Sequence, residues 1–275
     1  MKAAAFGDSF LVPGSQGHHW LEKLRDNQNW DILGMDQDGN MIGRTEGGSG
    51  PLSAISIFYN TIHELDDIDT LIFSWSQPSR LFHNKVRDIN MYNALKDNSR
   101  GYPEHKKIYE TALDYYSTFY LDTMEDLKLV GLLQWFDKVL CKDFSNKKIL
   151  HFYSFGAGTH PHTGDNAQLA NQYLFHKFQS GVTMYPSLMY FSVNEPTFVA
   201  KKQHLDQRSG HLGESNHDMI YNKVLEAMKM NPDDECLLTE SRPKYITDKY
   251  VDIWKDIDIN HATPPLFNNE NWIEK

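Results

Sequence analysis

The chain has 275 residues, of which 40% are hydrophobic and 13% aromatic, and its formal net charge is −10 at pH 7. The hydrophobic fraction is ample for a packed core and excludes wholesale disorder. The acidic balance argues against a nucleic-acid partner, because binding to phosphates needs clustered Lys and Arg, and no basic patch stands out.

Nothing in the sequence predicts export or a membrane partner. The N-terminal apolar run is too short for a secretory signal, and no apolar run approaches the length of a membrane span. The two cysteines, Cys141 and Cys236, have neither metal-ligand spacing nor a disulfide framework. We therefore expect a cytoplasmic protein.

The first apolar run, Ala3 to Phe6, ends abruptly in Gly7-Asp8-Ser9. This pattern predicts a buried first strand followed by a tight turn, with Gly7 supplying backbone freedom. Open α/β sheets bind ligands at the carboxyl ends of their strands, so Ser9 is a candidate functional residue. All three residue types also favour turns, and the tripeptide alone is a weak signal.

Further along the chain, apolar runs alternate with stretches of helical spacing. Strands are predicted at residues 3–6, 30–35, 69–75, 146–154 and 187–193. Helices are predicted at residues 16–24, 52–65 and 166–180, and in the stretch that contains residues 220–228. The alternation predicts an α/β fold of three αβα layers around a doubly wound parallel sheet of about five strands.

Two segments depart from this alternation. Residues 104–144 have apolar side chains at helical spacing throughout, which predicts one very long helix or two in sequence, with Asp122 or Asp126 as a break. The end of the chain is rich in Asp, Asn, Pro and isolated aromatic residues. We expect a domain of residues 1–231 and an irregular C-terminal extension, residues 232–275, that packs on the domain or on a partner.

A glycine-rich stretch, residues 44–51, precedes the helix predicted at 52–65. Free backbone N–H groups at the start of a helix suit an anion. The stretch lacks the Gly-Lys-Ser/Thr ending of a Walker-type phosphate loop.

Two histidine pairs, His18 with His19 and His160 with His162, lack carboxylate or cysteine partners at ligand spacing. We therefore predict no metal site and no cofactor.

The order of these features resembles that of the SGNH (GDSL-type) hydrolases over residues 3 to about 228. Gly7-Asp8-Ser9 resembles the nucleophile block of that family. Gly47-Gly48-Ser49 resembles the second block, in which a glycine N–H helps to form the oxyanion hole. The resemblance implies a flavodoxin-like fold and makes Ser9 the nucleophile.

The stretch from His211 to His217 resembles the closing block of the family, in which a catalytic histidine precedes a second histidine by six residues. This register implies that His211 is the base and that His217 is structural. The family places an aspartate three residues before the base, but Arg208 stands there, and Asp206 is the nearest candidate acid. An alternative register takes Glu214 and His217 as the acid–base pair.

The third block also departs from the family pattern. The family has Gly-x-Asn-Asp, whereas this chain has Ser74-Trp75-Ser76-Gln77, so the asparagine donor is missing at position 76. The Ser76 hydroxyl or the Gln77 amide is the expected replacement. Losing one such donor typically costs about two to three orders of magnitude in rate.

The resemblance implies hydrolysis of a small-molecule carboxylic ester or a carbohydrate O-acetyl ester. Ser9 would attack the ester, His211 would accept the proton of Ser9, and Asp206 would orient the imidazole. The N–H groups of Ser9 and Gly48 would bind the oxyanion, aided by residue 76 or 77.

The alternative is a weak or inactive SGNH-like module that binds glycans or other proteins. The missing asparagine and Arg208 support it, and residues 75–80 with the long aromatic helix most resemble divergent SGNH-like proteins encoded by bacteriophages. Such a protein would act in the host cytoplasm or the virion. It would contact a protein partner or a second copy through residues 232–275.

Overall fold

The structure of the protein is a computed structural model. It describes residues 1–13, 19–36, 41, 49–76, 80–83, 86, 88–89, 94, 103–120, 122–154, 176–185, 187–188 and 214–238.

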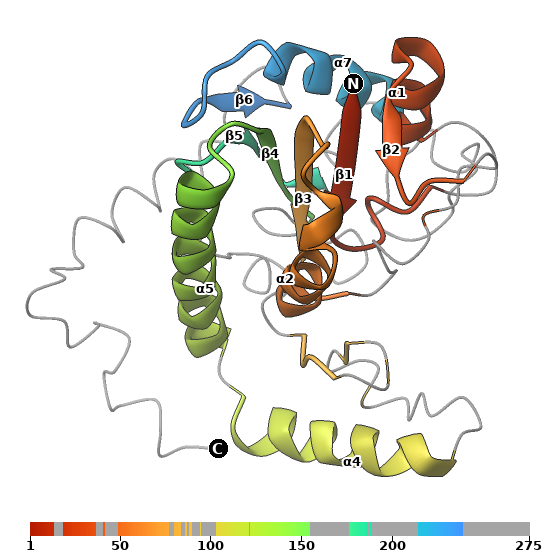
Figure 1. The fold of residues 1–275 in the computed structure, drawn as a ribbon. Coiled ribbons are helices and arrows are strands. Elements are labelled where there is room, and N and C mark those ends of the chain that lie inside the picture. Colours follow the sequence, from red (N-terminus) through yellow and green to blue (C-terminus); the bar gives the residue numbers. More distant parts are fainter. Residues whose placement is uncertain are drawn as a thin grey trace, which may run out of the picture. The chain divides into compact units, whose positions relative to one another are not determined.

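Six parallel strands form one sheet in the order β2-β1-β3-β4-β5-β6 (Figure 1). The strands are β1 Lys2–Phe6, β2 Asp31–Leu33, β3 Thr70–Trp75, β4 Lys148–Tyr153, β5 Val182–Tyr185 and β6 Glu235–Leu237. The helices are α1 Trp20–Gln28, α2 Pro51–Asn60, the short 3₁₀ helix η1 Ile62–Glu64, α4 Pro103–Thr118, α5 Asp122–Asp143 and α7 Glu214–Ala227. The predicted three-layer α/β fold is confirmed, with six strands.

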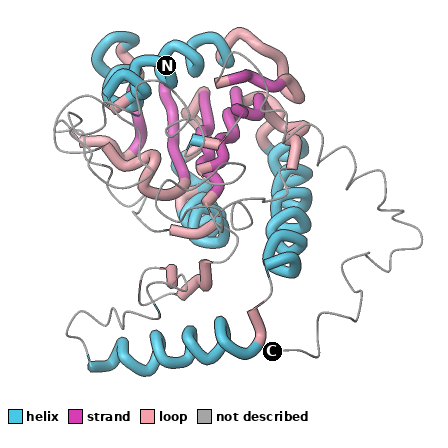
Figure 2. Tube along the Cα trace, turned by 180° about the vertical axis from the view of Figure 1, so that it is seen from behind, coloured by secondary structure: helices cyan, strands magenta, loops and turns pink. Residues whose placement is uncertain are grey.

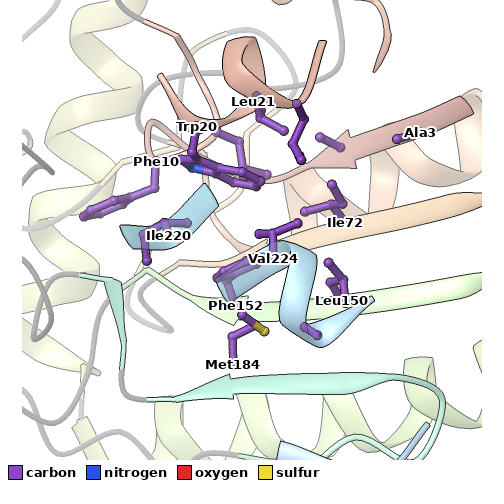
Figure 3. Close-up of a cluster of buried hydrophobic side chains, with 14 of the residues drawn as sticks. Ala3, Phe10, Trp20, Leu21, Ile72, Leu150, Phe152, Met184, Ile220 and Val224 are labelled. Atoms are coloured by element: carbon purple, nitrogen blue, oxygen red, sulfur yellow. The ribbon is translucent and has the colours of Figure 1, made fainter. Parts of the chain in front are cut away.

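The alternation of side chains along the central strands separates the two faces of the sheet. On one face, α1 and α7 pack over the strands, and Figure 3 shows their side chains closing over the sheet. This core includes Ala3, Ala5, Trp20, Leu21, Ile72, Leu150, Phe152, Met184, Ile220 and Val224. Figure 2 shows the same helices and strands from behind.

On the other face, aromatic side chains of the sheet contact α2 and α5. Phe6 of β1 and Phe73 of β3 are opposite each other in register and stack at 5.4 Å between ring centroids. Phe58 of α2 contacts Phe73 at 5.7 Å, and Phe136 of α5 contacts the same ring at 5.4 Å. Two layers of helices therefore enclose a sheet whose central strands are apolar on both faces, as buried parallel strands require.

Phe136 anchors α5 to the aromatic side chains of the sheet. Its buried ring meets Phe58 at 5.2 Å and Trp75 at 5.7 Å in edge-to-face geometry. We expect Phe136→Ala to lower the free energy of unfolding by about 3–5 kcal/mol, because the cavity cannot close between rigid rings. The neighbouring Trp135 is 49% exposed, and Trp135→Ala is expected to cost less than about 1 kcal/mol. Urea unfolding measures both, and equal losses would contradict this assignment of the core.

Two sequence predictions need correction, and a third is decided between its two alternatives. The helix predicted at 166–180 is wrong where it can be checked, because residues 176–180 are not helical and residues 166–175 lie outside the described residues. The strand predicted at 187–193 is wrong where it can be checked: β5 is Val182–Tyr185, Ser187 and Leu188 are not in a strand, and residues 189–193 lie outside the described residues. The stretch 104–144 forms two helices, and α5 begins at Asp122, one of the two candidate break positions.

The sheet also continues beyond the domain boundary expected at residue 231. Glu235–Leu237 form β6, which pairs with β5. The compact unit spans Met1–Ser241, and the rest of the chain, Arg242–Lys275, lies outside the described residues. Within the described part of the chain, no helix has the length and apolar character needed to cross a bilayer.

Candidate functional site

The order of the strands reverses between β1 and β3. The chain leaves β1 toward β2 on one side and later returns to β3 on the other. Ligands of open α/β sheets bind at such a switch point, beyond the carboxyl ends of the strands. Ser9 follows β1 and Ser76 directly follows β3, so two of the predicted site residues belong to this edge. Both are largely buried, at 9% and 4% exposed.

Backbone hydrogen bonds shape the turn that carries Ser9. The N–H of Leu11 donates to the Asp8 carbonyl at 3.0 Å, and the N–H of Val12 donates to the Ser9 carbonyl at 3.4 Å. Gly7 enters this turn against β3, and a Cβ atom there would lie 2.5 Å from the Ser74 carbonyl oxygen. The glycine before Asp8 is therefore required by the close approach of the two strands.

Asp8 joins the ends of three strands. Its Oδ1 accepts hydrogen bonds from the Ser154 hydroxyl after β4 at 2.8 Å, the Phe10 N–H at 3.2 Å and the Ser74 hydroxyl of β3 at 3.5 Å. The two serine hydroxyls lie 2.5 Å apart. Ser154 is not among the residues predicted for the site. It carries the same signal as Ser9 and Ser76, a small polar residue at the end of an apolar strand.

The Asp8 carboxyl is wholly buried, and within the described residues its Oδ2 has no hydrogen-bond partner. Burial raises the pKa of Asp8 above its ordinary value, while the positive charge of Arg80 and the hydrogen bond from Ser154 oppose the shift. A carboxyl with a perturbed pKa in this place is typical of functional sites.

The start of α2 holds a carboxylate of the protein itself. The N–H of Gly50 and the hydroxyl of Ser53, at 2.7 Å, both donate to Asp88 Oδ2. Burial raises the pKa of Asp88 above its ordinary value, and the hydrogen bonds from Ser53 and Gly50 partly oppose this shift. The glycine-rich stretch before α2 is predicted to bind an anion. At Gly50, the group that occupies this position is the carboxylate of Asp88.

The N-terminal part of α7 lies beside the Ser9 turn. The ring of His217 is 4.7 Å from that of His19, which caps α1. His19 Nε2 lies 3.0 Å from the Phe10 carbonyl oxygen, and the Leu21 N–H donates to His19 Nδ1 at 3.2 Å. These bonds assign a neutral His19 with its proton on Nε2. The N-terminal part of α7 therefore lies at the edge of the sheet that carries Ser9.

Four of the eight predicted site residues lie in the described part of the chain. These are Ser9, Ser76, His217 and Glu214, and of Glu214 only the backbone, as the first residue of α7, is described. The other four predicted site residues, Gly48, Gln77, Asp206 and His211, lie outside the described residues.

A second polar cluster lies on the α5 face of the sheet. Asp137 of α5 accepts hydrogen bonds from the N–H groups of Gln179 and Ser180, both at 2.9 Å, and its Oδ2 lies 2.8 Å from His176 Nε2. Burial by itself would raise the pKa of Asp137, but the hydrogen bonds from His176, Gln179 and Ser180 lower it overall. The cluster fastens the segment before β5 to α5.

His151 of β4 completes this second cluster. The indole N–H of Trp75 donates to His151 Nδ1 at 3.3 Å, and His151 Nε2 lies 3.2 Å from the Ser180 hydroxyl. Because the indole N–H can only donate, His151 is neutral and donates from Nε2. Complete burial lowers the pKa of His151 to about 3.

Among the described residues, no group of three or more His, Cys, Asp and Glu side chains could hold a metal ion. The chain matches no protein-family model, no curated protein and no solved structure. The assignment of the fold therefore comes from the strand order and the helices of the structure. The resemblance to the SGNH hydrolases comes only from the sequence motifs.

Proposed function

We propose that the protein is an SGNH-type serine hydrolase that cleaves a small-molecule or carbohydrate ester, with Ser9 as its nucleophile. The observation that carries the proposal is the position of Ser9, in the turn after the first strand at the switch point of the sheet. Ser76 follows the adjacent strand at the same edge.

In the proposed reaction, the Ser9 hydroxyl attacks the ester carbonyl while His211 takes its proton. The base then returns that proton to the leaving alcohol, and water releases the acid from the acyl-enzyme. Asp206 would orient His211. The N–H groups of Ser9 and Gly48 would stabilise the oxyanion, with the Ser76 hydroxyl or the Gln77 amide in place of the missing asparagine.

The position of α7 supports the assignment of the closing block. His211 precedes Glu214, the first residue of α7, by three positions, and His217 lies beside the cap of α1. Three residues span at most about 10 Å, so the proposal requires no long excursion of the chain. The pair of Glu214 and His217 stays the alternative register, because His217 already lies at this edge.

The test is labelling of the purified protein with a fluorophosphonate probe, together with turnover of a small acetyl ester. We expect Ser9→Ala to abolish both without changing the unfolding curve, because only the attacking hydroxyl is lost. Ser53→Ala, which removes a serine hydroxyl from α2, is the control and should still be labelled. A wild-type protein that is never labelled would exclude an activated Ser9 and favour the binding module.

A further inference from the structure

We infer that Asp8 is a positioning residue that holds Ser9 in its reactive orientation, an inference that rests on the proposed function. The serine is one member of a short turn, and the structure shows which groups fix that turn. Asp8 supplies two of them, one from its backbone and one from its side chain.

The two peptide groups that flank Ser9 are both held by Asp8. The Asp8 carbonyl, which belongs to the peptide before Ser9, accepts the Leu11 N–H at 3.0 Å. The Phe10 N–H, which belongs to the peptide after Ser9, donates to Asp8 Oδ1 at 3.2 Å. When the planes of these two peptide groups are fixed, the direction of the Ser9 N–H and the position of the Ser9 side chain are fixed too. Those are the two groups that the reaction needs.

The same carboxylate oxygen ties this turn to the neighbouring strands. Ser154 Oγ donates to Asp8 Oδ1 at 2.8 Å from the end of β4, and Ser74 Oγ approaches it at 3.5 Å from β3. Gly7 keeps β1 close enough to β3 for these contacts. The turn is therefore held by contacts to β3 and β4 as well as by its own strand, β1. The packing of these three strands fixes the position of Ser9.

The burial of Asp8 argues against a purely structural role. The charged form of a carboxyl that is 0% exposed is unfavourable for stability, because burial removes it from water. An uncharged amide side chain would fill the same space and still accept hydrogen bonds there, at a smaller cost of burial. A buried carboxyl with a perturbed pKa next to a candidate nucleophile is typical of functional sites.

The experiment compares the second-order rate of fluorophosphonate labelling in three variants, well below their unfolding temperatures and per folded molecule. Asp8→Ala removes the acceptor and is expected to slow labelling about 100-fold, because small misplacements of reacting groups have effects of that size. Asp8→Asn keeps an oxygen acceptor and should restore the rate to within about fivefold of the wild type.

Asp137→Ala is the matched control. It also removes a buried carboxylate that binds two backbone N–H groups, but in the cluster on the α5 face. It should lose stability and label at the wild-type rate. If Asp8→Ala does not fold, Ser154→Ala takes its place, with an expected slowing of about tenfold.

The outcomes separate the inference from the function. A labelled wild type with an equally fast Asp8→Ala or Ser154→Ala would overturn the inference and leave the hydrolase standing. An Asp8→Asn variant as slow as Asp8→Ala would also overturn it, because the acceptor would not be what matters. A wild type that is not labelled would reject the function itself, and the inference with it.

Discussion

Replacing Gly7 by alanine is expected to lower the free energy of unfolding by at least about 3 kcal/mol and to suppress the reactivity of Ser9. The added Cβ would lie 2.5 Å from the Ser74 carbonyl oxygen and 2.8 Å from the Ser74 Cβ, and Gly7 has a φ of +156°. The clash is with the backbone of an adjacent strand, which cannot move without breaking its pairing with β1. Urea unfolding and labelling by a fluorophosphonate probe measure the two effects.

Gly181→Ala provides the matched comparison. A Cβ at Gly181 would lie 2.3 Å from the Ile149 carbonyl oxygen, again on the backbone of a neighbouring strand. Gly181 directly precedes β5, and Ile149 is near the start of β4, so this contact lies at the amino edge of the sheet. We expect a similar loss of stability with no change in the labelling rate of the folded protein. A Gly7→Ala protein with wild-type stability would contradict the close packing of β1 on β3.

His151 is expected to make the protein lose stability as the pH falls from about 6.5 toward 3. In the unfolded chain a histidine gains a proton near pH 6.5, whereas in the folded protein burial lowers the pKa of His151 to about 3. Between these values the unfolded state binds more protons, so the free energy of unfolding decreases as the pH falls. The slope from this one group approaches about 1.4 kcal/mol per pH unit.

His151→Phe should flatten that slope. The ring centroids of His151 and Phe178 lie 3.6 Å apart, and a phenylalanine ring would keep this stacking. The Trp75 indole N–H would lose its acceptor. We expect a loss of about 1–3 kcal/mol at pH 7.5 and a smaller difference from the wild type at pH 4.5. Denaturant unfolding at several pH values measures both.

His63→Phe is the comparison for this pH dependence. The His63 side chain is 73% exposed and its ion pair with Glu64 lies at the surface, where such pairs contribute little, so the pH profile should stay close to that of the wild type. The range above pH 4.5 avoids the contribution of Asp137, whose lowered pKa affects stability only at more acidic pH. Parallel pH profiles of the wild type and His151→Phe would disprove a buried neutral His151.

The central strands could be predicted from the sequence, whereas the last two strands, β5 and β6, could not. β1, β3 and β4 are continuous apolar runs bounded by turn residues, the pattern that burial on both faces produces. β5 has four residues and β6 has three, too few to show a period. Their strand conformation comes from pairing with a neighbour. The longer apolar run at 187–193 gives a stronger local signal than β5 or β6, yet the strand predicted there is wrong where it can be checked, at Ser187 and Leu188.

The sequence by itself determined the alternating α/β architecture and the positions of Ser9 and Ser76 after their strands, because both follow from local apolar runs and the residues that end them. Only the tertiary structure decided what surrounds Ser9. The hydrogen bond from Ser154 to Asp8 joins residues 146 positions apart, and α7 brings His217 beside His19. The physical reason is that a parallel sheet gathers the carboxyl ends of strands from distant parts of the chain at one edge. The partners of a buried carboxylate there depend on strand order, which local patterns do not contain.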